Sequence, residues 1–279
     1  MIPIPSLPQA LETGLRNKKD DWGDDKVHVS DLAVAVGEKC ARQLWLRLNG
    51  YEKKEHTAGQ LLMFDHGNRI HERLVEVIKQ GLPEHWTIQA VEQEVSLGTV
   101  TGRYDTRMFN LAEGYEVIVD FKTTRGRAFN FLDKAKPAHI LQVQAYMTGA
   151  DADGGLVFYV DREGQNQARQ FYVERDDEFV WWAVKNTKLI AHGKRPPLLS
   201  PQVIVRENKG PDSVYLKQPW NCDYCDYLDV SCEGALPRAY RDLGIVGKIK
   251  EGRFELSEGI PEEVKDMVVL NIDREEVAV

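Results

Sequence analysis

Apolar residues recur every four positions early in the chain, a spacing that predicts a helix with one apolar face. The positions of this stripe are Leu32, Val36, Cys40, Leu44 and Leu48. We therefore expect a helix that begins at Ser30 and ends at Gly50. A second helix is expected over residues 65–79, before Gly81-Leu82-Pro83 stops it.

The period then changes to two, which predicts strands. Residues 88–97 and 99–109 are expected to form a hairpin around Gly98, and residues 116–122 (EVIVDFK) a strand that is apolar until its charged end. The later elements expected are a helix over 138–148, strands over 155–160 and 169–173, and a helix over 177–191. This mixture of strands and helices predicts an α/β fold with a mixed central sheet flanked by helices.

The remaining segments carry weaker patterns. Residues 1–27 are polar, with three prolines and a dense run of charges, and are expected to be a flexible N-terminal arm. Residues 192–219 are rich in proline and are expected to be an extended connection. We expect one domain over residues 28–235 and a C-terminal extension over residues 236–279.

Length and charge limit the classes of protein to which this chain can belong. The 279 residues suffice for one large domain. No stretch approaches the roughly 20 apolar residues that span a bilayer, and the start of the chain does not resemble a secretory signal, so we expect a cytoplasmic protein that does not bind membranes. The net charge of −8 argues against a protein that coats DNA. It is compatible with a nuclease, whose metal site needs carboxylates.

Three charged residues form the strongest candidate for chemistry. Asp120 and Lys122 lie two apart on a predicted strand, so their side chains share one face. Asp105 stands on the preceding strand. Two carboxylates can share Mg²⁺ or Mn²⁺, and a lysine can orient a water or offset charge on a phosphoryl group. Charged residues at strand ends are usually only solvated, so this trio needs further support.

That support comes from the order of four short motifs along the chain. The motifs are Gly67-x3-His71, Gly102-x2-Asp105, Asp120-x-Lys122 and Gln142-x3-Tyr146. Their succession resembles the motif series of the RecB-like nucleases of the PD-(D/E)xK superfamily. The resemblance implies a restriction-endonuclease-like fold and metal-dependent hydrolysis of phosphodiester bonds in DNA.

The resemblance also implies a role for each motif residue. The Mg²⁺ or Mn²⁺ ligands would be His71, Asp105, Asp120 and the Phe121 carbonyl. Lys122 would be the catalytic lysine, and Gln142 and Tyr146 would orient the catalytic site or contact the DNA backbone. The alternatives are that His71 is an ordinary helix histidine whose hydrogen bonds are satisfied, and that Gln142 and Tyr146 only pack their helix against the sheet. Glu94, on the strand opposite Asp105, is either a further contact to the metal or a surface glutamate.

The four cysteines form a second constellation. They are Cys40 and the cluster Cys222-x2-Cys225-x6-Cys232. Without a signal peptide, a metal or iron–sulfur centre is a more natural use than disulfides. Three clustered thiolates leave one ligand position open, which Cys40 can supply; a structural Zn²⁺ or a buried apolar Cys40 are the alternatives.

The cysteine pattern resembles the iron–sulfur subgroup of these nucleases. That subgroup contains the AddB nuclease domain and, closest in layout, the CRISPR-associated RecB-like exonucleases. The resemblance implies a [4Fe–4S] cluster that joins the two ends of the nuclease domain.

The expected partner is DNA. Arg103, Arg125 and Arg127 flank the proposed catalytic strand and are candidates for phosphate contacts, together with Tyr146. The resemblance favours an exonuclease on single-stranded ends, in DNA repair, recombination, phage replication or CRISPR adaptation, with a helicase, recombination or adaptation protein as partner. The alternative is a non-catalytic DNA-end-binding or assembly module of the same fold, with a structural cysteine cluster or zinc.

Overall fold

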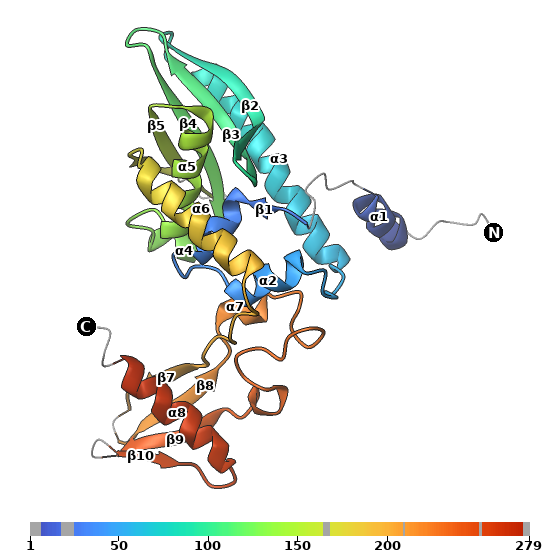
Figure 1. Ribbon diagram of the computed structural model, residues 1–279, viewed down its shortest axis with the longest axis vertical. Coiled ribbons are helices and arrows are strands. Elements are labelled where there is room, and N and C mark those ends of the chain that lie inside the picture. Colours follow the sequence, from blue (N-terminus) through green and yellow to red (C-terminus); the bar gives the residue numbers. More distant parts are fainter. Residues whose placement is uncertain (1–6, 18–24, 164–167, 209, 251–252, 276–279) are drawn as a thin grey trace, which may run out of the picture. The chain divides into compact units, whose positions relative to one another are not determined.

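The computed structural model describes the chain except for residues 1–6, 18–24, 164–167, 209, 251–252 and 276–279 (Figure 1). The chain divides into two compact units. Unit 1 comprises Met1–Leu48 and His56–Lys194, and unit 2 comprises Asn49–Glu55 and Arg195–Val279. The main boundary therefore falls near residue 195, whereas the sequence predicted one near 235.

Unit 1 is built on a six-stranded mixed sheet. Its strands are β1 (Val27–His28), β2 (Trp86–Leu97), β3 (Val100–Asn110), β4 (Tyr115–Thr124), β5 (Gly154–Asp161) and β6 (Ala168–Val173). The order is β1-β3-β4-β5-β6, and β2 pairs with β3. The β1–β3 and β4–β5 pairs are parallel and the other pairs are antiparallel. The predicted mixed sheet is confirmed.

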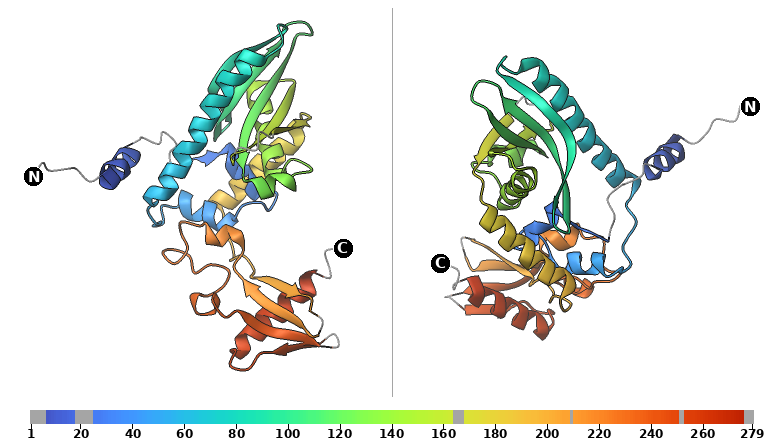
Figure 2. Two further views of the ribbon diagram at one scale, coloured as in Figure 1. Left: turned by 180° about the vertical axis from the view of Figure 1, so that it is seen from behind. Right: turned by 45° about the horizontal axis from the view of Figure 1, so that its top comes forward.

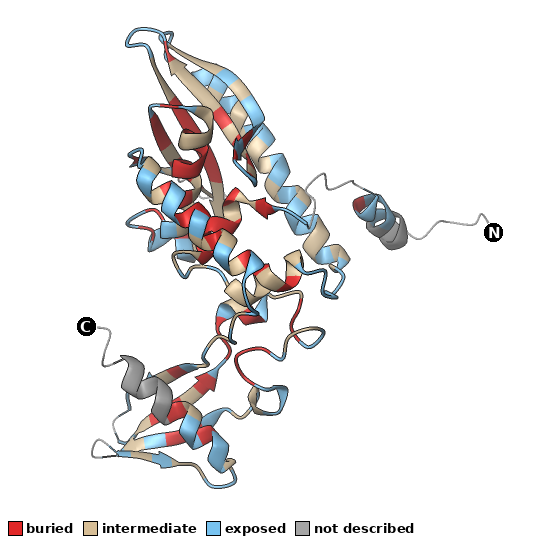
Figure 3. Cartoon of the chain, in the orientation of Figure 1, coloured by how far each residue is buried: buried red, intermediate tan, exposed pale blue. Residues whose placement is uncertain are grey.

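Helices cover both faces of this sheet. The helix α3 (Ala58–Gly81) lies on one face, and α5 (Pro137–Ala150) and α6 (Asp177–His192) lie on the other (Figures 1 and 2). The main core contains residues of the sheet, α5 and α6, whereas a smaller cluster around Val119 and Phe121 packs with Leu74 of α3. All of α3 is described and none of its residues is buried (Figure 3). Side chains on α3 near the sheet therefore remain accessible to solvent.

The N-terminal part of unit 1 differs from the predicted single helix. A 3₁₀ helix, η1 (Val29–Val34), and α2 (Ala41–Leu48) replace it. Gly37 lies between them with φ of 75°, a left-handed conformation that interrupts a helix. The segment expected to be a flexible arm contains α1 (Leu7–Arg16). A short helix, α4 (Gly126–Asn130), follows β4.

Unit 2 is a four-stranded antiparallel sheet with one long helix. Its elements are β7 (Gln202–Arg206), β8 (Asp212–Lys217), α7 (Trp220–Asp223), η2 (Arg238–Tyr240), β9 (Ile245–Lys250), β10 (Arg253–Leu256) and α8 (Glu262–Glu275). Val214, Val246 and Val264 belong to its core. The prediction of an extended connection over residues 192–219 was wrong, because β7 and β8 form a hairpin there. Among the described residues, no helix is long and apolar enough to cross a membrane.

Candidate active site

Strands β3 and β4 of unit 1 separate where the predicted carboxylates lie, and we call this place the fork. Strand β3 pairs with β4 only as far as Thr106 and Val119, and with β1 at its other end. Asp105 and Asp120 each follow immediately beyond the last β3–β4 pair. There the amide of Phe121 donates a hydrogen bond of 2.5 Å to Oδ2 of Asp105. The side chain of one strand thus satisfies a backbone donor of the next, which fixes the orientation of Asp105.

Helix α3 brings His71 to this fork. Its Nδ1 lies 3.5 Å from Oδ1 of Asp105, and its ring meets the edge of Phe121 at a centroid distance of 5.8 Å. Burial lowers the pKa of His71, but hydrogen bonding to Asp105 and the charge of that carboxylate more than offset this, so the pKa stands above its usual value. The imidazole faces an anionic site.

Asp120 and Lys122 lie side by side on β4. Asp120 is 2% exposed, and its Oδ2 is 2.6 Å from Nζ of Lys122. Burial raises the pKa of Asp120 to about 6; Lys122 opposes the rise and Asp105 adds to it. A buried carboxylate beside a second carboxylate is costly unless a cation compensates it. Lys122 provides part of that compensation.

Gln142 and Tyr146 form a hydrogen-bonded pair on α5. Nε2 of Gln142 donates to the Tyr146 hydroxyl at 2.9 Å. Tyr146 is 4% exposed, and burial raises its pKa, so the phenol stays protonated. A Cβ on Gly102 would lie 2.8 Å from Cε1 of Tyr146. The glycine of the Gly102-x2-Asp105 motif therefore lets the tyrosine pack against β3, and Tyr146 is placed to position the site from within the core.

The basic residues near the site occupy different environments. Arg103 forms an ion pair of 2.7 Å with Glu92. Arg125 is exposed and precedes α4, while the side chain of Arg127 is outside the described part of the chain.

Three ammonium groups lie near His139. The pKa of His139 is lowered to about 3, first by burial and then by three neighbouring ammonium groups. These groups belong to Lys122, Lys136 and Lys39. A positive field beside a carboxylate site suits the phosphates of a polynucleotide.

Glu92 is a member of the site that the sequence interpretation missed. Among the described residues, ligand atoms of His71, Glu92 and Asp105 all lie within 4.8 Å of one another. Imidazole and carboxylate donors of this kind suit Mg²⁺ or Mn²⁺. Glu94 lies on the strand opposite Asp105, as predicted, but it is exposed and stands across from Arg103, whereas Glu92 stands across from Asp105. Counting outward from the hairpin turn gives the correct partner.

The cysteines lie in both units. Cys40 directly precedes α2 in unit 1, whereas the other three lie in unit 2. The loop of unit 2 folds back on itself: the Cys225 amide donates to the Cys222 carbonyl at 3.1 Å, and the Asp229 amide donates to the Cys232 carbonyl at 2.7 Å.

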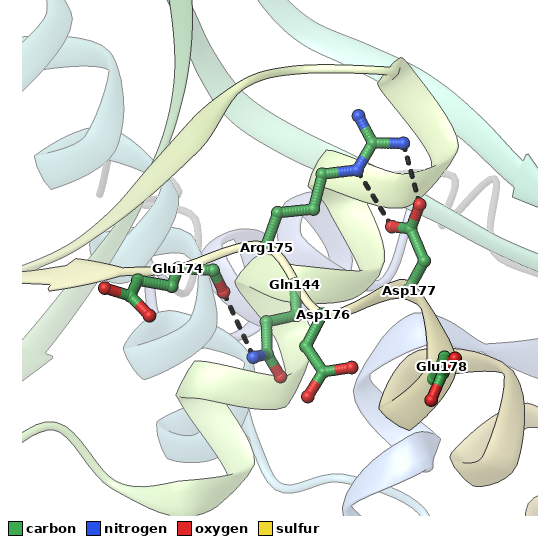
Figure 4. Close-up of a pocket in the computed structure, with 6 residues that line it drawn as sticks. All are labelled: Gln144, Glu174, Arg175, Asp176, Asp177 and Glu178. Atoms are coloured by element: carbon green, nitrogen blue, oxygen red, sulfur yellow. Dashed lines mark hydrogen bonds and ion pairs between the residues drawn. The ribbon is translucent and has the colours of Figure 1, made fainter.

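A second acidic hollow in unit 1 has a structural explanation. It is lined by Gln144, Glu174, Arg175, Asp176, Asp177 and Glu178 (Figure 4). Asp177 binds Arg175 through two contacts of 2.8 and 2.9 Å, and Asp176 accepts a hydrogen bond of 2.9 Å from the Phe179 amide. These carboxylates stabilise the N-terminus of α6, where acidic groups are favourable. The hollow therefore carries no argument for a second metal centre.

Comparison with known protein families identifies the fold. A model of the PD-(D/E)XK nuclease superfamily matches residues 29–232. The chain belongs to the PD-(D/E)XK nuclease superfamily. The match spans most of the chain and includes every residue of the site described above. PD-(D/E)XK nucleases use divalent metals, in agreement with the donors that converge around Asp105.

Solved structures show a looser similarity. SSO0001 is 20% identical with a TM-score of 0.47, covering 82% of this chain and 95% of that one. An alkaline exonuclease from Laribacter hongkongensis is 16% identical with a TM-score of 0.44, covering 60% and 87%. A phage-related exonuclease from Haemophilus somnus 129PT is 18% identical with a TM-score of 0.43, covering 60% and 92%. At these scores the structures add nothing to the family assignment. No curated protein matches the chain.

Proposed function

We propose that this PD-(D/E)XK protein is a Mg²⁺- or Mn²⁺-dependent deoxyribonuclease that hydrolyses phosphodiester bonds from the ends of single-stranded DNA. The observation that carries the proposal is the convergence at one fork of the sheet. His71 lies 3.5 Å from Asp105, and Lys122 lies 2.6 Å from the buried Asp120. An imidazole and two carboxylates can hold a divalent cation, and a lysine beside them can stabilise charge on a phosphate, so these groups can support metal-dependent hydrolysis of a phosphodiester.

The residues at the fork fit a divalent cation. His71, Asp105, Asp120 and the carbonyl of Phe121 would hold it. When bound, the cation supplies a water of lowered pKa and a positive charge for the phosphoryl oxygens. The fit is supported by the burial of Asp120 and its raised pKa, since a cation would remove the cost of ionising this carboxylate.

Lys122 acts on the substrate. Its ammonium is held next to Asp120, and the Lys122 side chain is 20% exposed, so a phosphate at the fork can reach it. We assign it the stabilisation of negative charge on the phosphate that is attacked. Gln142 and Tyr146 act as positioning residues, because Tyr146 of α5 is buried against Gly102 of β3 and Gln142 donates a hydrogen bond to its hydroxyl.

The substrate preference rests on chemistry around the fork and on the sequence resemblance. Arg103, Arg125 and Arg127 would contact the DNA backbone, and the lysines that surround His139 extend the positive field. The activity on single-stranded ends, the cytoplasmic location and a helicase, recombination or adaptation partner that presents those ends are part of the proposal.

The second part of the proposal is a [4Fe–4S] cluster. Its ligands would be Cys40, Cys222, Cys225 and Cys232. Two observations support it: the family match runs from residue 29 to 232 and so includes all four cysteines, and the backbone of unit 2 folds the last three into one compact loop. Zinc is the competing occupant. Iron and acid-labile sulfide in anaerobically purified protein would distinguish the two.

Cleavage of labelled DNA tests the main proposal. The protein is incubated with Mn²⁺, Mg²⁺ or EDTA and with linear single-stranded, linear double-stranded or circular single-stranded DNA. We expect metal-dependent release of nucleotides from linear single strands and none from circles. Lys122→Ala should lower the rate on the order of 10²- to 10³-fold while Mn²⁺ still binds. DNA binding without cleavage under every metal condition would favour a binding module.

A further inference from the structure

Glu92 stands opposite Asp105 in the hairpin of β2 and β3. The pairs Val91–Thr106 and Gln93–Tyr104 bracket the two acidic residues, so the register places them directly across from each other. Ligand atoms of Glu92, Asp105 and His71 lie within 4.8 Å of one another. The four motifs singled out in the sequence do not include Glu92.

This arrangement is unfavourable in the absence of a cation. Like charges directly opposite each other destabilise an antiparallel pair. Glu92 also has φ of 51°, a left-handed conformation that a glutamate rarely adopts. Arg103 forms an ion pair of 2.7 Å with Glu92, which offsets part of this repulsion. An acidic residue kept at such a position indicates a task that needs its carboxylate.

We propose that Glu92 is a further ligand of the divalent cation, beside His71 and Asp105, and that Arg103 neutralises its carboxylate while the cation is absent. The inference rests on the metal site of the proposed function. A side chain that is 44% exposed can exchange an arginine for a metal ion without unfolding the hairpin. The imidazole favours Mn²⁺ over Ca²⁺, which prefers oxygen ligands alone.

The affinity for Mn²⁺ measured by calorimetry, without DNA, tests this assignment. Glu92→Gln should weaken binding by about tenfold or more, the range of changes at groups close to a bound metal. Glu94→Gln is the matched control, because it removes the same charge two residues along the same strand. In the strand register Glu94 stands across from Arg103 and not from Asp105. It should bind Mn²⁺ within about twofold of the wild type. Equal affinity of the Glu92→Gln variant and the wild type would overturn the assignment.

The stability of the metal-free variants separates a ligand from a structural partner of Arg103. If Glu92 is a metal ligand that repels Asp105, the melting temperature of Glu92→Gln in EDTA should be unchanged or higher than that of the wild type. A purely structural ion pair predicts a lower melting temperature and an unchanged Mn²⁺ affinity, which would refute the proposal. Glu92→Asn provides a second variant, since asparagine tolerates the left-handed backbone.

The test also distinguishes this inference from the proposed nuclease activity. A wild type that binds Mn²⁺ through Glu92 but leaves every DNA substrate intact would refute the nuclease and support the ligand. A wild type that cleaves DNA while Glu92→Gln binds Mn²⁺ normally would support the nuclease and refute the ligand. Absence of Mn²⁺ binding by the wild type would refute the ligand directly.

Discussion

The amide of Phe121 donates a hydrogen bond of 2.5 Å to the carboxylate of Asp105, across the fork between β3 and β4. This bond gives Asp105 two tasks, because the carboxylate satisfies a backbone donor and also faces His71. Substitutions can separate the tasks. Asparagine retains an oxygen that accepts the hydrogen bond, whereas leucine retains none.

Asp105→Asn should therefore keep the fold and lose Mn²⁺ binding and cleavage. Asp105→Leu should lose both, and in addition lower the free energy of unfolding by about 1–3 kcal/mol, the cost of an unsatisfied buried donor. Urea denaturation in EDTA measures the stability and calorimetry measures the metal. Equal stability of the two variants would show that water satisfies the Phe121 amide.

The raised pKa of Asp120 predicts a pH dependence in the absence of metal. The folded protein holds the proton up to a pKa of about 6, whereas the unfolded chain releases it near the usual value of 3.8. The carboxyl therefore contributes stability below pH 3.8, and this contribution is lost as the pH rises to about 6. Asp120→Asn should remove this slope, measured by urea denaturation in EDTA.

The same titration affects the metal. Since a cation binds the ionised carboxylate, the Mn²⁺ affinity of the wild type should rise with pH through the pKa of Asp120. Lys122→Ala should move the rise to higher pH, because the ammonium lowers this pKa. An Mn²⁺ affinity that does not change with pH over roughly one unit on either side of that pKa would contradict the assignment of Asp120 as a ligand.

Gly102 and Gly67 belong to two motifs but differ in their surroundings. A Cβ at Gly102 would lie 2.5 Å from Cγ2 of Val29 and 2.8 Å from Cε1 of Tyr146. Gly102→Ala should cost about 1–3 kcal/mol through overpacking and reduce cleavage through the displaced Tyr146. At Gly67, inside α3, a Cβ would meet no atom within 4 Å.

Gly67→Ala is therefore the matched control. It should stabilise the protein by roughly 0.5–1 kcal/mol, the helix preference of alanine over glycine. Thermal unfolding with EDTA and a cleavage assay check both variants. A stable but inactive Gly67→Ala variant would show that the substrate passes close to this face of α3.

Loss of a cysteine tests the cluster. Cys222 is 7% exposed, and Cys222→Ala should remove iron and lower both stability and DNA binding, with a loss of about 2 kcal/mol or more if the cluster acts as a long-range crosslink. Anaerobic purification, iron analysis and urea denaturation measure this. Asn221→Ala, at the neighbouring position, is the control. A stable, brown and active Cys222→Ala variant would exclude the crosslinking role.

Sequence periodicity predicted the elements that carry the site. The strands around Gly98, the EVIVDFK strand and the helix with Gln142 and Tyr146 all appear. The EVIVDFK strand and this helix are apolar runs with clear ends, and both are buried over several consecutive residues. The motif series predicted that His71, Asp105 and Lys122 lie near one another, and the structure brings them to one fork.

The remaining features depend on backbone geometry that periodicity does not encode. The stripe from Leu32 to Leu48 continued through Gly37, so the break there was not visible. The hairpin of β7 and β8 has only short strands between prolines. Glu92 was missed because a contact across a hairpin depends on the register, and a shift of two residues exchanges one glutamate for another.

Unit 2 is discontinuous in the chain, since residues 49–55 belong to it together with residues 195–279. The Lys54 amide donates to the Asp226 carbonyl at 2.8 Å, and the Ser231 hydroxyl donates to the Glu52 carbonyl at 2.7 Å. During synthesis, residues 49–55 leave the ribosome long before those partners exist. Unit 2 therefore closes only late in translation, and a nascent chain that stalls before residue 231 presents an incomplete second unit to the proteases of the cell.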